Sequence, residues 1–177
     1  MNKLIKGFIQ IYTGNGKGKT TAAIGQAVRA AGYGLKTYIV QFMKEYPYNE
    51  LNSLKLLNEW ITIEQFCGDD FVYKKQLPSK DEIEKAKTGL ISAKEKMLSC
   101  DYNIIILDEV CTSIYFKLIH LRDVLLLMEN KPENVELILT GRYCPTELIE
   151  KADLVTEMKE IKHYYESGIS SRPGIEA

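Results

Sequence analysis

The residues best suited to chemistry lie near the N-terminus, in the sequence TGNGKGKTT at positions 13–21. Glycines allow backbone N–H groups to approach phosphate oxygens without interference from a Cβ atom. Lys19 can place a positive charge on the β- and γ-phosphates of a nucleotide, and the Thr20 hydroxyl can bind Mg²⁺. An apolar run precedes the stretch and a helix-forming segment follows it. This order predicts an ATP-binding loop made of Thr13, Gly14, Asn15, Gly16, Lys17, Gly18, Lys19, Thr20 and Thr21.

The loop departs from the usual phosphate-loop pattern at one fixed position. The pattern G-x-x-x-x-G-K-[ST] begins with a glycine, and this chain has Thr13 in that place. The alternative interpretation is a glycine-rich turn that binds nothing. The strand, the Gly-Lys-Thr sequence and the helix nevertheless fall in the register that phosphate binding requires, which favours a binding loop.

Two carboxylates follow a second strongly apolar run. Asp108 and Glu109 come directly after NIIIL at positions 103–107, as in the Walker B pattern of nucleotide-binding enzymes. One carboxylate of such a pair binds Mg²⁺, and its neighbour orients the reacting group. The alternative is that Asp108 caps the helix that follows. The metal role is favoured because a phosphate loop needs a partner for its metal, so we predict Thr20, Asp108 and Glu109 as metal ligands.

Arg142 and a pair of aromatic residues are further candidates. Arg142 follows a predicted strand and can neutralise phosphate charge, although a surface arginine in a turn fits the sequence equally well. Phe71 and Tyr73 lie in the irregular stretch 67–79 and would point the same way in an extended chain, as a stacking platform for a flat ligand. From the residues alone, a role in capping the core is favoured for both. His163 is expected to be structural, and histidine acid–base catalysis is not expected in a chain with 2 histidines.

These residues need a framework that brings strand ends together. Apolar runs predict strands at 7–12, 36–42, 60–66, 103–107, 135–140 and 153–158. Helices are predicted at 20–31, 50–58, 79–99, 110–116, 118–129 and 145–152, the third with a capping box of Ser79 and Glu82. Alternating strands and helices predict a three-layer α/β fold of the P-loop NTPase (RecA-like) type with a mostly parallel sheet. Such folds bind ligands at the carboxyl ends of the strands, where all the candidate residues lie.

Composition limits the class of protein. The 177 residues predict one domain, 1–177, and a hydrophobic content of 45% supplies a full core. A net charge of −1 predicts no general attraction to nucleic acid or membrane. Neither a signal peptide nor a membrane-spanning run is evident, and the 4 cysteines form no C-x-x-C pair. We therefore expect a cytoplasmic protein. From the residues alone it is an Mg-ATP-binding α/β domain, with ATP hydrolysis as the default reaction.

Longer stretches of the chain resemble one family. They are TGNGKGKTTAA, RAAGYGLKTYIVQFMK, IIILDEV, LILTGRYCPTELIEKADLVTEM and IKHYYESGISSRPGIEA. Together they closely resemble the ATP:cob(I)alamin adenosyltransferases of the P-loop type, from about residue 5 to residue 176. Thr13 at the usual glycine position is part of that family's pattern.

The resemblance implies a reaction and roles for the candidate residues. The 5′-deoxyadenosyl group of ATP would pass to the Co(I) of a reduced corrinoid, giving adenosylcobalamin and triphosphate, with Lys19, Thr20 and Glu109 among the catalytic residues. Phe71 and Tyr73 match the family's Phe-x-Trp pair against the lower face of the corrin, with Tyr in place of Trp. Glu50 matches a glutamate that contacts the nucleotide sugar, and Arg142 would join the nucleotide site.

The resemblance also implies partners. It implies a homodimer and an electron donor such as a flavoprotein, with neither nucleic acid nor membrane as a partner. The alternative function is a P-loop ATPase or a small-molecule kinase, which would release ADP instead of triphosphate.

Overall fold

The computed structural model describes residues 2–44, 48–73 and 75–176, which form a six-stranded sheet in which every pair of neighbours is parallel. The strand order is β3-β2-β4-β5-β1-β6. The bounds are β1 (Ile9–Thr13), β2 (Thr37–Phe42), β3 (Ile61–Phe66), β4 (Ile104–Asp108), β5 (Glu136–Thr140) and β6 (Leu154–Glu157). All the predicted strands are confirmed, and so is the α/β class of the fold.

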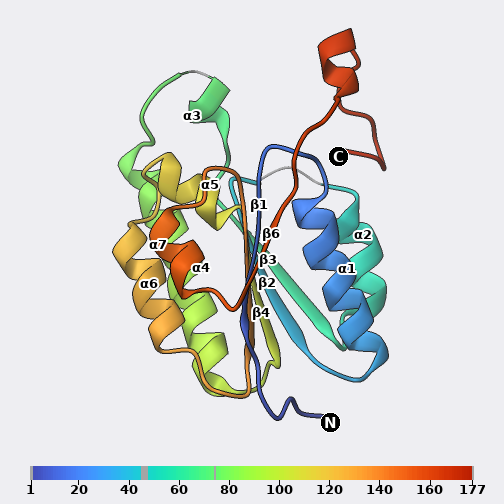
Figure 1. Cartoon of the computed structure of the whole chain (residues 1–177), viewed down its shortest axis with the longest axis vertical. Helices are drawn as coiled ribbons and strands as arrows, with labels where there is room; N and C mark the ends of the chain where they lie inside the picture. Colours follow the sequence, from blue (N-terminus) through green and yellow to red (C-terminus); the bar gives the residue numbers. More distant parts are fainter. Residues whose placement is uncertain (1, 45–47, 74, 177) are drawn as a thin grey trace.

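Helices cover both faces of the sheet (Figure 1). One face carries α1 (Lys19–Gly32) and α2 (Glu50–Leu54), which continues into the short 3₁₀ helix η1 (Lys55–Leu57). The other carries α4 (Lys80–Ser99), α5 (Val110–Tyr115), α6 (Leu121–Glu129) and α7 (Thr146–Lys151). The helical turn α3 (Asp70–Tyr73) and the C-terminal segment with η2 (Tyr164–Ser167) lie at the carboxyl edge of the sheet.

Side-chain size explains how closely the helices approach the sheet. β4 is buried along its whole length, as expected for a central strand covered on both faces. The buried side of α1 consists of small residues, Ala23, Ala27, Ala30 and Ala31. On the other face, a Cβ atom at Gly89 of α4 would lie 2.8 Å from the ring of Phe66 and 2.9 Å from that of Phe42. Small residues therefore let α1 and α4 pack closely against the two faces of the sheet.

Two sequence predictions meet different outcomes here. The capping box of α4 is confirmed, since the Ser79 N–H donates to Glu82 Oε2 at 2.6 Å and the Glu82 N–H donates to Ser79 Oγ at 3.2 Å. Residues 70–73, in the stretch predicted to be irregular, form the helical turn α3, so the chain at Phe71 is not extended. Among the described helices, none combines the length and the apolar character needed to span a bilayer.

Candidate functional site

The glycine-rich loop connects β1 to α1 at the carboxyl edge of the sheet (Figure 1). Gly14 and Gly18 adopt φ angles of 94° and 118°, which favour glycine. A Cβ atom at Gly14 would lie 2.5 Å from the carbonyl oxygen of Met158, and one at Gly16 would lie 2.7 Å from it. The Gly16 N–H donates to the same oxygen at 2.7 Å. The loop is thus braced by the chain that leaves β6, and this contact requires small residues at 14 and 16.

Lys19 begins α1 and folds back over the loop. Its ammonium donates to the carbonyl oxygens of Gly14 at 2.7 Å and Gly16 at 2.8 Å. The side chain is buried, and burial lowers the pKa of Lys19 against the opposing effect of Glu109. A phosphate group in the loop would give this buried cation an anionic partner.

Asp108 is the centre of a buried polar network below the loop. Its Oδ1 accepts hydrogen bonds from the hydroxyls of Thr20 at 2.9 Å and Thr140 at 2.7 Å. Its Oδ2 accepts from Gln41 Nε2 at 3.1 Å and from the Lys44 ammonium at 2.8 Å. The contacts join the ends of three neighbouring strands to the start of α1. Thr20 and Asp108, which the sequence predicts as metal ligands, are therefore in direct contact.

Lys44 is a site residue that the sequence analysis missed. Its ammonium contacts both Asp108 and the Thr20 hydroxyl, the latter at 3.0 Å. Burial disfavours the charged forms of both Lys44 and Asp108, but the attraction between the two charges outweighs it. The pKa of Lys44 is therefore raised, and the pKa of Asp108 is lowered. The available signal was its position just beyond β2, the strand that pairs with β4.

Glu109 and Arg142 are held together by the start of α5. Glu109 has a φ of 61°, an uncommon value for a residue other than glycine, and its N–H donates to the Thr140 hydroxyl at 2.9 Å. The Thr112 hydroxyl donates to the Glu109 carboxylate and accepts from the Arg142 N–H at 3.0 Å. Gly141 makes this approach possible, since a Cβ atom there would lie 2.7 Å from the Thr112 nitrogen.

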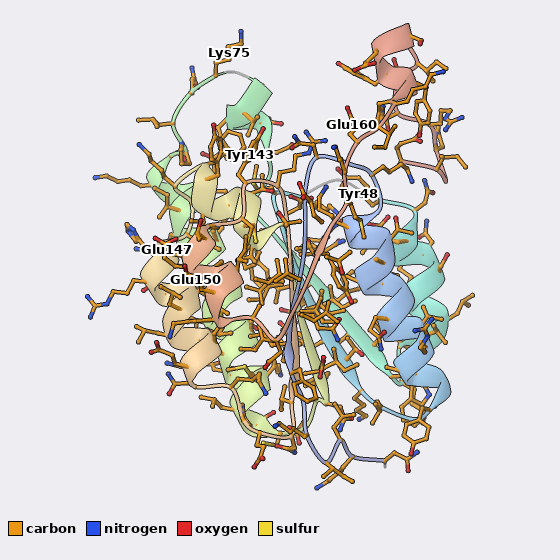
Figure 2. All side chains as sticks on the ribbon, viewed as in Figure 1. Tyr48, Lys75, Tyr143, Glu147, Glu150 and Glu160 are labelled. Carbon is orange, nitrogen blue, oxygen red and sulfur yellow. The ribbon has the colours of Figure 1, made fainter. Side chains whose placement is uncertain are left out.

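An open cleft of about 590 Å³ lies above these residues. Predicted site residues line this cleft. From the phosphate loop they are Gly16, Lys17, Gly18, Lys19, Thr20 and Thr21, and from elsewhere in the chain they are Glu50, Glu109 and Arg142. Asp108 lies beneath the cleft at 1% side-chain exposure. Thr13, Gly14 and Asn15 form the approach to the loop and are not part of the lining. Figure 2 shows Tyr48, another lining residue, near the start of α1.

The C-terminal segment forms a further wall of the cleft. His163, Gly174, Ile175 and Glu176 all line it. Glu176 accepts hydrogen bonds from the Arg172 guanidinium at 3.0 and 3.2 Å and from the Tyr164 hydroxyl. His163 Nδ1 accepts from the Tyr165 N–H at 3.1 Å, which fits the expected structural role, but its place in the lining was not foreseen.

The oxygen donors of the site suit Mg²⁺. Within residues 2–44, 48–73 and 75–176, no group of three or more His, Cys, Asp and Glu side chains is placed to hold a metal ion by itself. Nucleotide-bound Mg²⁺ needs no such cage, because it takes one or two carboxylates together with phosphate oxygens and water. The Thr20 hydroxyl and the Asp108 carboxylate already share a cation, the Lys44 ammonium. That arrangement fits a divalent ion between the same oxygens.

Phe71 lies in the hydrophobic core and not on the cleft. Its side chain is 3% exposed and packs edge-to-face on Phe116, with ring centroids 5.9 Å apart. The contacts continue from Phe116 to Tyr115 at 5.1 Å and from Tyr115 to Tyr143 at 4.1 Å, the last pair stacked and exposed. Tyr73 ends α3, but its side chain lies outside the described part of the structure. The structure thus matches the core-capping alternative for Phe71.

Comparison with known proteins identifies relatives over nearly the whole chain. Residues 5–177 match the family model described as ATP:corrinoid adenosyltransferase BtuR/CobO/CobP. The corrinoid adenosyltransferase of Escherichia coli K12 is 33% identical over 172 residues, which cover 97% of this chain and 86% of the relative. Corrinoid adenosyltransferase CobA of Salmonella typhimurium LT2 is 32% identical over 174 residues, with the same two shares.

A solved structure supports the fold independently. The crystal structure of a KaiC-like protein from Pyrococcus horikoshii OT3 aligns with a TM-score of 0.54, covering 89% of this chain and 75% of its own. At 21% sequence identity, this likeness concerns the fold alone. It agrees with the P-loop architecture predicted from the strand and helix pattern.

Proposed function

We propose how this chain, which belongs to the ATP:corrinoid adenosyltransferase family and transfers the adenosyl group of ATP to a corrinoid, arranges its residues for that reaction. The observation that carries the proposal is the meeting of Lys19, Thr20, Glu109 and Arg142 on one cleft above Asp108. The family match does not favour the alternative ATPase or kinase.

The triphosphate of ATP binds to the loop from Thr13 to Thr21. Backbone N–H groups of the loop and the N-terminus of α1 face the phosphates, and Lys19 exchanges its carbonyl partners for phosphate oxygens. Arg142 lines the same cleft, its backbone N–H donates to the Thr112 hydroxyl, and its guanidinium adds a second positive charge. Glu50 lies on the same cleft and suits the nucleotide sugar.

Thr20, Asp108 and Glu109 hold Mg²⁺ in the loaded enzyme. When bound, the ion supplies electrostatic stabilisation of the negative charge on the phosphates. The chain contributes the geometry: Thr140 and Gln41 orient the Asp108 carboxylate, and Thr112 orients that of Glu109. These supporting hydrogen bonds fix the oxygens before the nucleotide arrives, which reduces the reorganisation needed during reaction.

The reaction needs no activated side chain. Co(I) of the reduced corrinoid is the nucleophile: its electron pair forms the bond to C5′ of ATP while the bond from C5′ to the α-phosphate oxygen breaks. Triphosphate leaves with the electron pair of the broken C5′–O bond. The residues around the loop therefore serve by placing C5′ in line with the cobalt and by stabilising the leaving group, for which Lys19 and Arg142 supply positive charge at the cleft.

The corrinoid contacts rest on the family pattern. Phe71 and Tyr73 would meet the lower face of the corrin, and Phe71 must leave its packing on Phe116 to do so. Movement of α3, a short element at the carboxyl edge, would allow this (Figure 1). A homodimer, a flavoprotein electron donor and a cytoplasmic location complete the proposal on the same basis, without nucleic acid or membrane as partners.

Separation of the phosphate products tests the reaction. The enzyme is incubated with Mg-ATP and reduced cobalamin, and the phosphates are resolved by ion exchange. We expect triphosphate equal in amount to adenosylcobalamin. Release of ADP and phosphate at the same rate with or without the corrinoid would instead establish the ATPase alternative.

A further inference from the structure

The Lys44 ammonium lies within the buried polar network around Asp108. It lies 2.8 Å from Asp108 Oδ2 and 3.0 Å from Thr20 Oγ1. The Lys44 side chain is 12% exposed and that of Asp108 is 1% exposed. The ammonium also lies 5.3 Å from the centre of the Tyr48 ring. A buried carboxylate and a hydroxyl thus share one cation, which enters the site from the loop after β2.

Both oxygens belong to residues that are proposed as ligands of Mg²⁺. Mg²⁺ binds oxygen at about 2.0–2.1 Å and requires near-octahedral geometry. The ammonium uses Asp108 Oδ2 and Thr20 Oγ1 at ordinary hydrogen-bond distances, so a divalent ion held by the same atoms would meet a positive charge at short range. Both cations cannot hold these two oxygens at once.

We propose that Lys44 is a positioning residue that takes the metal's place in the nucleotide-free enzyme. It holds Thr20 and Asp108 in register and neutralises the buried carboxylate until Mg²⁺ displaces its ammonium. Metal alone then binds weakly, and the ion enters together with the phosphates of ATP, which supply the further ligands. The inference rests on the proposed assignment of Thr20 and Asp108 as metal ligands.

Titration of the nucleotide-free protein with Mn²⁺, followed by electron paramagnetic resonance, tests this exchange. Lys44→Met removes the competing charge and is expected to bind Mn²⁺ at least about tenfold more tightly than the wild type. Lys151→Met is the matched control, because it removes an exposed lysine paired with Glu129 at 2.7 Å. Its affinity for Mn²⁺ should equal that of the wild type.

Asp108→Asn distinguishes a failure of the metal site from a failure of the role of Lys44. Suppose that Asp108→Asn weakens Mn²⁺ binding, whereas Lys44→Met binds Mn²⁺ no more tightly than the wild type. The metal site then stands, and the proposed role of Lys44 is overturned. If Asp108→Asn binds Mn²⁺ as the wild type does, the metal assignment falls, and the inference falls with it.

A measurement on the wild type covers the case in which Lys44→Met does not fold. Amine-reactive labelling read by mass spectrometry should modify Lys44 slowly without metal and faster at saturating Mn²⁺. Lys131, which donates to the carbonyl oxygens of Gly7 and Val135 at the opposite end of the sheet, should label equally in both conditions. An unchanged rate at Lys44 would overturn the inference.

Discussion

Phe71→Ala tests both the packing of Phe71 and its expected role toward the corrinoid. The ring is 3% exposed and contacts Phe116 edge-to-face, so truncation removes a full aromatic side chain from the core. Such a change lowers the free energy of unfolding by about 3–5 kcal/mol. For a chain of this length, 1 kcal/mol corresponds to a Tm change of about 2–4 °C, so the Tm should fall by roughly 6–20 °C.

Stability and activity are measured on the same preparations. The free energy of unfolding comes from urea denaturation, and turnover is compared between Co(II) corrinoid with a reductant and chemically pre-reduced Co(I). If Phe71 helps to expel the lower ligand, Phe71→Ala should lose much more turnover from Co(II) than from Co(I). The matched control is Leu127→Ala in α6, a residue 2% exposed whose loss also costs about 2–5 kcal/mol but should affect both substrates equally.

Two results would refute this reasoning separately. A loss of stability below about 1 kcal/mol would mean that Phe71 is not packed in the core in solution. Equal losses of turnover with Co(II) and Co(I) would remove Phe71 from the step that prepares the corrinoid, and would leave it a purely structural residue.

Three further changes probe the loop, the buried pair and the packing of α4. Lys19→Ala removes the buried cation of the phosphate loop and should weaken Mg-ATP binding by roughly 2–5 kcal/mol in calorimetry; unchanged affinity would show that the loop is not used. The pKa of Asp108 is lowered, so its contribution to stability is present above the unfolded value of about 3.9 and is lost as pH falls further. The free energy of unfolding of the wild type should therefore fall relative to that of Asp108→Asn as the pH drops below about 4, and a constant difference would argue against the pairing. Gly89→Ala inserts a methyl group less than 3.0 Å from two rings and should destabilise the fold by about 1–3 kcal/mol in thermal unfolding, whereas a gain in Tm would contradict the packing described.

The sequence by itself determined the elements and the chemistry that depend on local patterns. The apolar run 103–107 predicted a strand buried on both faces, and Ser79 with Glu82 predicted the capping box that begins α4; the structure has both. The Gly-Lys-Thr order between strand and helix located the phosphate loop. Parallel connectivity then placed Asp108 and Arg142 at the same edge of the sheet, because the carboxyl ends of parallel strands lie together.

Only the tertiary structure decided which distant groups meet. Lys44 reaches Asp108 because β2 and β4 are neighbours in the sheet, and Gly14 and Gly16 are required by a carbonyl of Met158 far along the chain. Phe71, expected on a loop, is buried because α3 turns its ring onto Phe116. Residue type and spacing report local backbone preferences, whereas these contacts depend on strand order and on how the layers pack. A single sequence does not encode that order in any local pattern.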